Sequence, residues 1–282
     1  MSEETAPYGT GPGAAKAPVK RVRTHHLREM KQRGEKFTML TAYEQYAAEV
    51  FDEAGIDVLL VGDSASNNVF GNETSLPVTV DELIPLVRAV TRSAHRALVV
   101  ADLPFGSYQA SPEQAYLTAV RFMKEAGAHS VKLEGGLAMV PQVRKLVEGG
   151  IPVMAHIGFT PQSEHTLGGY RVQGRGDAAK QVLEEARAME EAGAFGIVME
   201  MVPGDVAADV SAAVGIPTIG IGAGHRCDGQ VLVWQDAFGL RGGRMARFVK
   251  QYADLRGVLR DAASAYARDV KDGTFPGPEH TF

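Results

Sequence analysis

Short apolar runs recur along the chain from Phe37 onward, and each ends in a polar or glycine residue. The runs are rich in Val, Ile, Leu and Met, and most show no alternation of polar and apolar positions. This pattern is typical of parallel β-strands that are buried on both faces. The eight predicted strands are Phe37–Ala42, Asp57–Gly62, Leu98–Asp102, Ser130–Glu134, Pro152–Ile157, Phe195–Glu200, Pro217–Ile221 and Val231–Gln235.

Helical patterns occupy most of the intervals between these runs. A capping serine followed by proline, Ser111-Pro112, predicts where one helix begins, and Gly127 predicts where it ends. Glycines close several of the other patterns in the same way. The remaining predicted helices are Glu44–Ala54, Val80–His95, Asp177–Ala192, Asp205–Val214 and Gln251–Asp272.

Repeated strand–helix units predict the α/β class with a parallel sheet, and eight strands over about 200 residues are the number and length of a single (β/α)8 TIM barrel. The alternative is an open doubly wound sheet, which more often carries Gly-x-Gly-x-x-Gly after its first strand. Here that segment reads Leu40-Thr-Ala-Tyr-Glu44, without glycine. We therefore expect a disordered, flexible N-terminal arm over residues 1–23 and a barrel domain with a C-terminal helix over residues 24–282.

Composition and charge exclude several classes of protein. The chain of 282 residues carries 29 Lys and Arg against 34 Asp and Glu, a net charge of −5, which gives no overall field for nucleic acid or an anionic membrane. Its longest apolar runs are far shorter than the roughly 20 residues that a bilayer requires. The single cysteine, Cys227, excludes an intramolecular disulfide and fits a reducing compartment.

Acidic residues end or directly follow three consecutive predicted strands: Asp63, Asp102 and Glu134. In a (β/α)8 barrel the active site lies at the carboxyl ends of the strands, and neighbouring strands are about 4.8 Å apart, so these groups can converge at one rim. Clustered carboxylates need positive charge between them, and oxygen ligands without His or Cys suit Mg²⁺. Taken singly, Asp63-Ser64 could instead cap a following helix, and Asp102 could shape a turn.

Three further residues surround this predicted Mg²⁺ site. Lys132 lies two residues before Glu134 on the same strand, so both point to one side, and the lysine could hold an anionic substrate or form a structural salt bridge. Glu200 ends the sixth strand, apart from the metal cluster, where a carboxylate could act as general base or be a satisfied buried acid. His156 is interpreted as structural, hydrogen-bonded beneath the site.

Two loops offer weaker signals. Thr166–Arg175 contains glycines and arginines that suit a mobile lid, although an ordinary surface loop has the same composition. The glycine-rich segment Gly222–Gly229 follows the seventh strand, where many barrels bind phosphate. Glycines also serve turns, so no function is assigned to this segment.

Long motifs in order along the chain closely resemble the ketopantoate hydroxymethyltransferase (3-methyl-2-oxobutanoate hydroxymethyltransferase) family of pantothenate biosynthesis, from about Thr24 to the C-terminus. The matching stretches are Met39-Leu-Thr-Ala-Tyr43, Val61-Gly-Asp-Ser64, Leu76-Pro-Val-Thr-Val80, Ala101-Asp-Leu-Pro-Phe105, Val131-Lys-Leu-Glu-Gly-Gly136, Gly168-Gly-Tyr-Arg-Val-Gln-Gly-Arg175, Met199-Glu200, Val202-Pro203, Ile219-Gly-Ile-Gly-Ala-Gly224, Asp228-Gly-Gln230 and Asp236-Ala-Phe-Gly239.

The resemblance implies a TIM barrel enzyme that uses Mg²⁺ and 5,10-methylenetetrahydrofolate as co-substrate. The family transfers a hydroxymethyl group to 3-methyl-2-oxobutanoate, giving 2-dehydropantoate, and forms cytoplasmic homodecamers. No nucleic-acid or membrane partner is implied. The family's functional positions fall on Asp63, Asp102 and Glu134 for the metal, on Asp63, Ser64, Asp102 and Lys132 for substrate binding, and on Glu200 for the catalytic proton acceptor.

The chemistry agrees with this resemblance. A 2-oxo acid can chelate one metal ion through its carboxylate and ketone oxygens, which acidifies the neighbouring C–H. Glu200 would remove that proton, and Mg²⁺ with Lys132 would stabilise the enolate.

Two other functions compete with this one. A Mg²⁺-dependent lyase or mutase of the isocitrate lyase and phosphoenolpyruvate mutase kind would chelate the same type of acid, but the lyases' Lys-Cys-Gly-His-type loop is absent. A non-catalytic ligand-binding barrel would not need Glu200 beside the metal.

Overall fold

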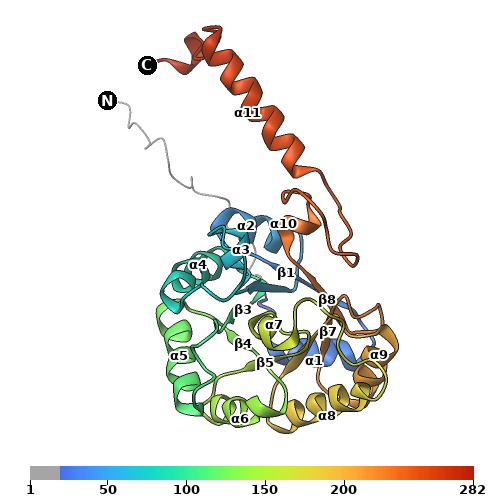
Figure 1. The fold of residues 1–282 in the computed structure, drawn as a ribbon. Helices are drawn as coiled ribbons and strands as arrows, with labels where there is room; N and C mark the ends of the chain where they lie inside the picture. Colours follow the sequence, from blue (N-terminus) through green and yellow to red (C-terminus); the bar gives the residue numbers. More distant parts are fainter. Residues whose placement is uncertain (1–19) are drawn as a thin grey trace.

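The computed structural model describes residues 20–282 and has a closed barrel of eight parallel strands, each paired with its neighbours in sequence and β8 with β1 (Figure 1). The predicted (β/α)8 barrel is therefore confirmed, while residues 1–19 of the predicted arm lie outside the described residues. The strands are β1 (Phe37–Thr41), β2 (Val58–Val61), β3 (Leu98–Asp102), β4 (Ser130–Glu134), β5 (Val153–Gly158), β6 (Gly196–Glu200), β7 (Thr218–Ile221) and β8 (Gly229–Leu232).

Burial on both faces explains why the strands show no polar alternation. In β2, Val58 and Leu60 join the core inside the barrel, whereas Leu59 and Val61 join the layer between the strands and the surrounding helices. Both sets are buried because the sheet is closed and covered by helices.

Helices surround the barrel, and their ends follow from local sequence. The Ser111 hydroxyl accepts a hydrogen bond from the Gln114 N–H, as expected for a cap, and Thr79 with Glu82 forms a capping box. The helices are α1 (Thr24–Gln32), α2 (Gln45–Glu53), α3 (Ala65–Asn68), α4 (Val80–Ser93), α5 (Pro112–Glu125), α6 (Val140–Glu148), α7 (Glu164–Leu167), α8 (Ala178–Glu191), α9 (Gly204–Ala213), α10 (Trp234–Ala237) and α11 (Leu255–Lys271); the short 3-10 turns are η1 (Leu137–Met139), η2 (Pro161–Ser163) and η3 (Pro278–His280).

The eighth strand differs from the prediction. It begins at Gly229, two residues before the predicted Val231, and Trp234 already belongs to α10. The segment looked like a loop because glycines crowd it, yet Gly229 is needed within the strand: a Cβ there would lie 2.5 Å from the ring of Phe37. The described chain between β7 and β8 contains no helix, so the helix that normally follows the seventh strand of a (β/α)8 barrel is missing there.

The last residues of the segment assigned to the arm are attached to the barrel. The Arg21 guanidinium donates hydrogen bonds to the carbonyl oxygens of Ala94 and Ala97, and the Val22 N–H donates to Arg96 O. Val22 itself is buried. The helix α1 that follows was not predicted as an element; it buries Leu27 against the core inside the barrel.

The C-terminal helix α11 projects away from the barrel (Figure 1). It begins at Leu255, four residues later than predicted, where the Asp254 side chain accepts the N–H of Gly257. Gly257 is the one buried residue of this helix, whereas Val258, Leu259 and Tyr266 are each more than half exposed. Among residues 20–282, no helix has the length and apolar character needed to cross a membrane.

His129, directly before β4, supports a prediction about acid stability. Its Nδ1 accepts the Val99 N–H at 2.9 Å, and burial, with smaller contributions from the charges of Arg21 and Arg23, lowers its pKa to about 4. The unfolded chain therefore binds a proton that the folded chain does not. The stabilising contribution of His129 is complete above its ordinary pKa of 6.5 and is lost as the pH falls towards about 4.

We expect that lowering the pH from about 7.5 to about 5 reduces the melting temperature of the wild type by a few degrees more than that of His129→Asn. The asparagine keeps a hydrogen-bond acceptor but does not titrate. The difference corresponds to about 1 kcal/mol, because His129 is partly exposed and screened by solvent. Calorimetry of both proteins at the two pH values measures it, and equal falls would contradict the assignment.

Candidate active site

The predicted site residues meet in one cavity at the carboxyl ends of the strands. The cavity wall also contains His156, Tyr170, Asp236 and Arg241, with apolar side chains from β2, β6, β7 and β8. Strands far apart in sequence thus supply one polar site with an apolar wall, as expected for this barrel. The predicted residues that line it are Asp63, Ser64, Asp102, Lys132, Glu134 and Glu200.

The three carboxylates predicted to bind metal come from consecutive strands. Asp102 and Glu134 are the last residues of β3 and β4, and Asp63 follows β2 by one glycine. The Asp63 N–H donates to Asp102 Oδ2 at 3.1 Å, which joins two of them directly. The sequence placed these groups at one rim of the barrel, and each is at most 5% exposed, so they form the buried floor of the site there.

Lys132 forms a salt bridge, which was one of the two roles that the sequence allowed for it. Its Nζ lies 2.9 Å from Asp102 Oδ1, and both side chains are buried. Burial lowers the pKa of Lys132, but the charges of Asp102, Glu134 and Asp63 outweigh it and raise the pKa above the ordinary value. The lysine is therefore a permanent cation on the floor of the cavity.

Burial and the neighbouring charges shift the pKa values of the three acids in different directions. Burial, together with the neighbouring charges of Asp102 and Glu134, holds the pKa of Asp63 well above its ordinary value. Burial also raises the pKa of Asp102, although Lys132 opposes the rise. For Glu134, burial is outweighed by His156, Lys132 and a backbone hydrogen bond, so its pKa is lowered.

His156 was interpreted as structural and lies within the site. Its Nδ1 is 3.3 Å from Glu134 Oε1 and 3.3 Å from Lys132 Nζ, and its Nε2 is 3.4 Å from Glu200 Oε2. Burial and Lys132 disfavour the charged ring, but Glu134 and Glu200 favour it more and raise its pKa to about 9. The imidazolium therefore lies between Glu134 on the floor and Glu200, in ion-pair contact with both.

Backbone geometry fixes Glu200 at the end of β6. The following residue, Met201, has a φ of 49°, the one positive φ outside glycine in residues 20–282, and such strain concentrates at functional sites. The Glu200 carbonyl accepts the Phe159 N–H at 2.8 Å. A Cβ on Gly158 would lie 2.5 Å from that carbonyl oxygen, so the close approach of β5 to Glu200 requires glycine.

Gln162 and Tyr108 are buried polar residues that the sequence analysis did not identify. Gln162 Nε2 donates to Asp63 Oδ2, and the Gln162 N–H donates to Glu134 Oε2, both at 2.9 Å. The Tyr108 hydroxyl lies 2.7 Å from Gln162 Oε1. Tyr108 lies in a loop and Gln162 in the short turn η2, and no motif distinguishes them from a surface tyrosine or glutamine. Their roles depend on contacts over long sequence separations.

Ser64 faces the cavity from the start of α3. Its hydroxyl lies 2.8 Å from the hydroxyl of Tyr43, and its side chain makes no cap hydrogen bond to the helix. The Ser64 side chain therefore does not cap α3, which was the alternative role of this segment. Burial raises the pKa of Tyr43 far above its ordinary value, so the phenol remains protonated.

The donor set fits a divalent cation by charge. If ionised, Asp63, Asp102, Glu134 and Glu200 carry four negative charges, and Lys132 with His156 balances two of them. No three His, Cys, Asp or Glu side chains within residues 20–282 are already arranged as a metal cluster. Asp102 Oδ1 is already paired with the Lys132 ammonium at 2.9 Å, so the unbalanced negative charge of the carboxylate set, and not a free oxygen, is what favours a cation.

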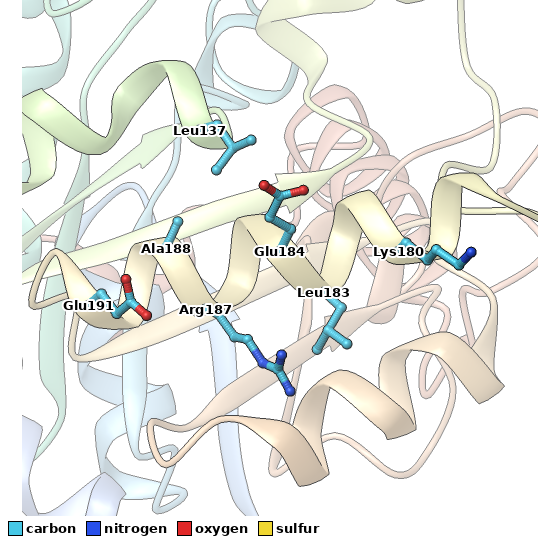
Figure 2. Close-up of a pocket in the computed structure, with 7 residues that line it drawn as sticks. All are labelled: Leu137, Lys180, Leu183, Glu184, Arg187, Ala188 and Glu191. Carbon is cyan, nitrogen blue, oxygen red and sulfur yellow. The ribbon is translucent and has the colours of Figure 1, made fainter.

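Of the two loops with weaker sequence signals, one lines the cavity and the other borders a separate hollow. The predicted lid, Thr166–Arg175, begins inside α7, and its Tyr170 packs on Phe159 with ring centroids 4.7 Å apart and lines the cavity. The segment after β7 borders a separate shallow hollow with Lys36 and Phe248. Figure 2 shows another hollow, along the outer side of α8, and none of its lining side chains is buried: Leu137, Lys180, Leu183, Glu184, Arg187, Ala188 and Glu191.

Solved structures with similar folds include phosphonopyruvate hydrolase in complex with oxalate and Mg²⁺, with a TM-score of 0.59 at 12% identity over 91% of this chain and 92% of that one. A 2,3-dimethylmalate lyase of the PEP mutase/isocitrate lyase superfamily has a TM-score of 0.57 at 16% identity, covering 94% and 90%. At such identity these similarities establish the fold alone.

Relatives of known name are much closer. A protein from Nocardioides named 3-methyl-2-oxobutanoate hydroxymethyltransferase is 82% identical over 286 residues, covering 99% of this chain and 97% of that protein. One of the same name from Arthrobacter is 68% identical over 289 residues, covering 100% and 96%. The family model described as ketopantoate hydroxymethyltransferase matches residues 21–278. The chain therefore belongs to the ketopantoate hydroxymethyltransferase family of enzymes.

Proposed function

We propose that this enzyme transfers a hydroxymethyl group from 5,10-methylenetetrahydrofolate to 3-methyl-2-oxobutanoate, forming 2-dehydropantoate. The observation that carries the proposal is the cavity in which Asp63, Asp102 and Glu134 surround Lys132, with Glu200 on the wall. The names of the relatives support the substrate, and their high identity over the whole chain favours this reaction over that of the lyases.

Asp63, Asp102 and Glu134 would hold Mg²⁺ directly or through water. When bound, the ion supplies Lewis acidity to the oxygens of a 2-oxo acid and makes the adjacent C–H more acidic. A solved neighbour, phosphonopyruvate hydrolase, is in complex with oxalate and Mg²⁺, which agrees with this type of ligand. The buried carboxylates and their excess negative charge are the features of this chain that support a metal.

The side chains of the cavity would then bind the keto acid. Lys132 is a buried cation that can neutralise anionic oxygen, and the hydroxyl and N–H of Ser64 can donate to the substrate carboxylate. Asp102, paired with Lys132, keeps the ammonium group in place. The apolar residues of β6, β7 and β8 in the same wall suit the branched alkyl end of the substrate.

Glu200 would accept the proton from C3 of the keto acid. His156 Nε2 lies 3.4 Å from Glu200 Oε2, so the imidazolium would attract this carboxylate beside the cavity. The methylene carbon of the folate carries two C–N bonds. Water adds to this carbon as the first C–N bond breaks, and loss of the second C–N bond releases the carbon at the oxidation level of formaldehyde, while both folate nitrogens take up protons. The C3 carbanion, stabilised as an enolate next to Lys132, then forms the C–C bond to this carbon, and its oxygen is protonated to the hydroxyl, so the products are 2-dehydropantoate and tetrahydrofolate.

We also propose a cytoplasmic homo-oligomer, a decamer by family resemblance, in which α11 packs against a second copy of the chain. Its apolar face, defined here as Val258, Leu259, Tyr266 and Val270, repeats at helical spacing and is exposed. A helix of 17 residues that projects from its own barrel needs another surface to bury this face.

The metal assignment predicts that a chelator abolishes hydroxymethyl transfer and that Mg²⁺ restores it. Asp102→Asn keeps the volume of the side chain but removes a charge, and it should weaken Mg²⁺ binding at least about tenfold in calorimetry. Asp102→Ala would be a poorer test, because it removes the hydrogen-bond acceptor as well as the charge and leaves Lys132 buried without any partner at this position.

Asp236→Asn is the matched control, since Asp236 lines the same cavity from α10 and pairs with Arg241 instead. Its affinity for Mg²⁺ should be unchanged. Full activity in metal-free buffer would overturn the metal assignment.

The proton transfer can be measured without folate. With Mg²⁺ and 3-methyl-2-oxobutanoate alone, the wild type should exchange the C3 proton with D₂O, and Glu200→Gln should slow this exchange at least about a hundredfold. NMR follows the exchange, and calorimetry shows that the keto acid still binds.

Glu73→Gln alters an exposed carboxylate of the same cavity and should exchange at the wild-type rate. Exchange near that rate in Glu200→Gln would mean that another group is the base.

The role of α11 predicts that Leu259→Glu lowers the molar mass measured by light scattering, since a charge on the apolar face opposes its burial. Ser264→Glu places the same charge on the opposite side of the helix and should leave the mass unchanged. A wild type that is monomeric at micromolar concentration would contradict the assembly.

A further inference from the structure

The geometry points to Gln162 as a positioning residue that orients two carboxylates, Asp63 and Glu134, towards a cation, with Tyr108 holding the amide in place. This inference rests on the proposed metal site and extends it to residues outside the predicted ligand set. Gln162 lies in η2, the turn after β5, and is 5% exposed. Its side chain reaches back across the barrel mouth to Asp63, 99 positions earlier in the sequence.

One residue joins two acids that repel each other. The side-chain Nε2 donates to Asp63 Oδ2 and the backbone N–H donates to Glu134 Oε2, each at 2.9 Å. Both donors are neutral, so they fix one oxygen of each carboxylate without adding the positive charge that would compete with a metal ion. Outer partners of this kind orient metal ligands and influence affinity.

The orientation of the Gln162 amide is determined by its surroundings. Nε2 also donates to Leu103 O at 3.0 Å, and Oε1 lies 2.7 Å from the Tyr108 hydroxyl and 3.1 Å from Gln109 Nε2. A flipped amide would place its oxygen against a carboxylate and a carbonyl, neither of which can donate. All four hydrogen-bonding positions of the amide are therefore used in one arrangement only.

Tyr108 supports this arrangement from the loop after β3. Its hydroxyl accepts the Glu134 N–H at 3.1 Å. Its single proton can be donated to Gln162 Oε1 at 2.7 Å, which is closer than the other acceptor, Glu134 O, at 3.1 Å. The ring is 1% exposed, and burial keeps the phenol protonated by raising its pKa. Tyr108 thus connects the backbone of one acid to the amide that holds the other, and its effect should pass through Gln162.

The test measures Mn²⁺ affinity by electron paramagnetic resonance in the absence of substrates, alongside melting temperature. Gln162→Met has nearly the same length but neither donates nor accepts through an amide, and it should weaken Mn²⁺ binding by about tenfold to a hundredfold. A purely structural role would lower the melting temperature and leave the affinity of the folded protein unchanged. Steady-state hydroxymethyl transfer should require correspondingly more metal for half-maximal rate.

Gln114→Met is the matched control. Gln114 accepts the Ala110 N–H and donates to Gly106 O in the same loop region, without contact to the carboxylates. It should lose hydrogen bonds of the same kind and keep wild-type Mn²⁺ affinity.

Tyr108→Phe removes only a hydroxyl and keeps the test valid if Gln162→Met does not fold. It should also weaken Mn²⁺ binding, and where both variants fold their effects should be less than additive, because Tyr108 acts through Gln162.

The outcomes separate the two proposals. A wild type that binds no Mn²⁺ refutes the proposed metal site itself. If the wild type binds Mn²⁺ and folded Gln162→Met binds it with the same affinity, the positioning role is refuted and the proposed reaction stands. If Gln162→Met does not fold, unchanged affinity in Tyr108→Phe has the same meaning. A loss of affinity in Gln162→Met but not in Gln114→Met supports the inference.

Discussion

The burial of an excess of negative charge at the carboxyl end of the barrel is the constraint on which the site depends. Asp63, Asp102 and Glu134 lie on the cavity floor, where low polarity strengthens their repulsion. Lys132 and His156 relieve part of it, while burial, together with the neighbouring acids, still raises the pKa of Asp63 and of Asp102. Under the proposed function, a divalent cation would supply the missing charge, and the same charge would activate a 2-oxo acid.

Maintaining such a cluster requires supports that carry no charge of their own. The segments after β3 and β5 provide them as Tyr108 and Gln162. Gln162 donates to the carboxylates of Asp63, just after β2, and of Glu134, on β4, and Tyr108 accepts the backbone N–H of Glu134. These contacts exist because a closed parallel barrel brings all its carboxyl-terminal loops to one side. Closure of the sheet thus both concentrates the charge and delivers the groups that orient it.

The barrel itself is shared with enzymes of other reactions. Phosphonopyruvate hydrolase and 2,3-dimethylmalate lyase have the same fold at 12% and 16% identity. What distinguishes chains on this fold is the set of side chains at the strand ends, since a fold does not determine a function. In this chain the set includes Glu200, which is followed by the strained Met201 and lies beside the imidazole of His156.

The sequence by itself determined the barrel, most strand bounds and the acids at the strand ends, because burial on both faces and parallel strand order leave patterns within a few neighbouring residues. The tertiary structure alone decided the start of β8 at Gly229, where the ring of Phe37 needs the space, and the exposure of the α11 face. It also decided that His156 contacts Glu200 and that Gln162 contacts Asp63. These contacts join residues 44 and 99 positions apart, and no local pattern encodes a partner that only closure of the barrel brings within reach.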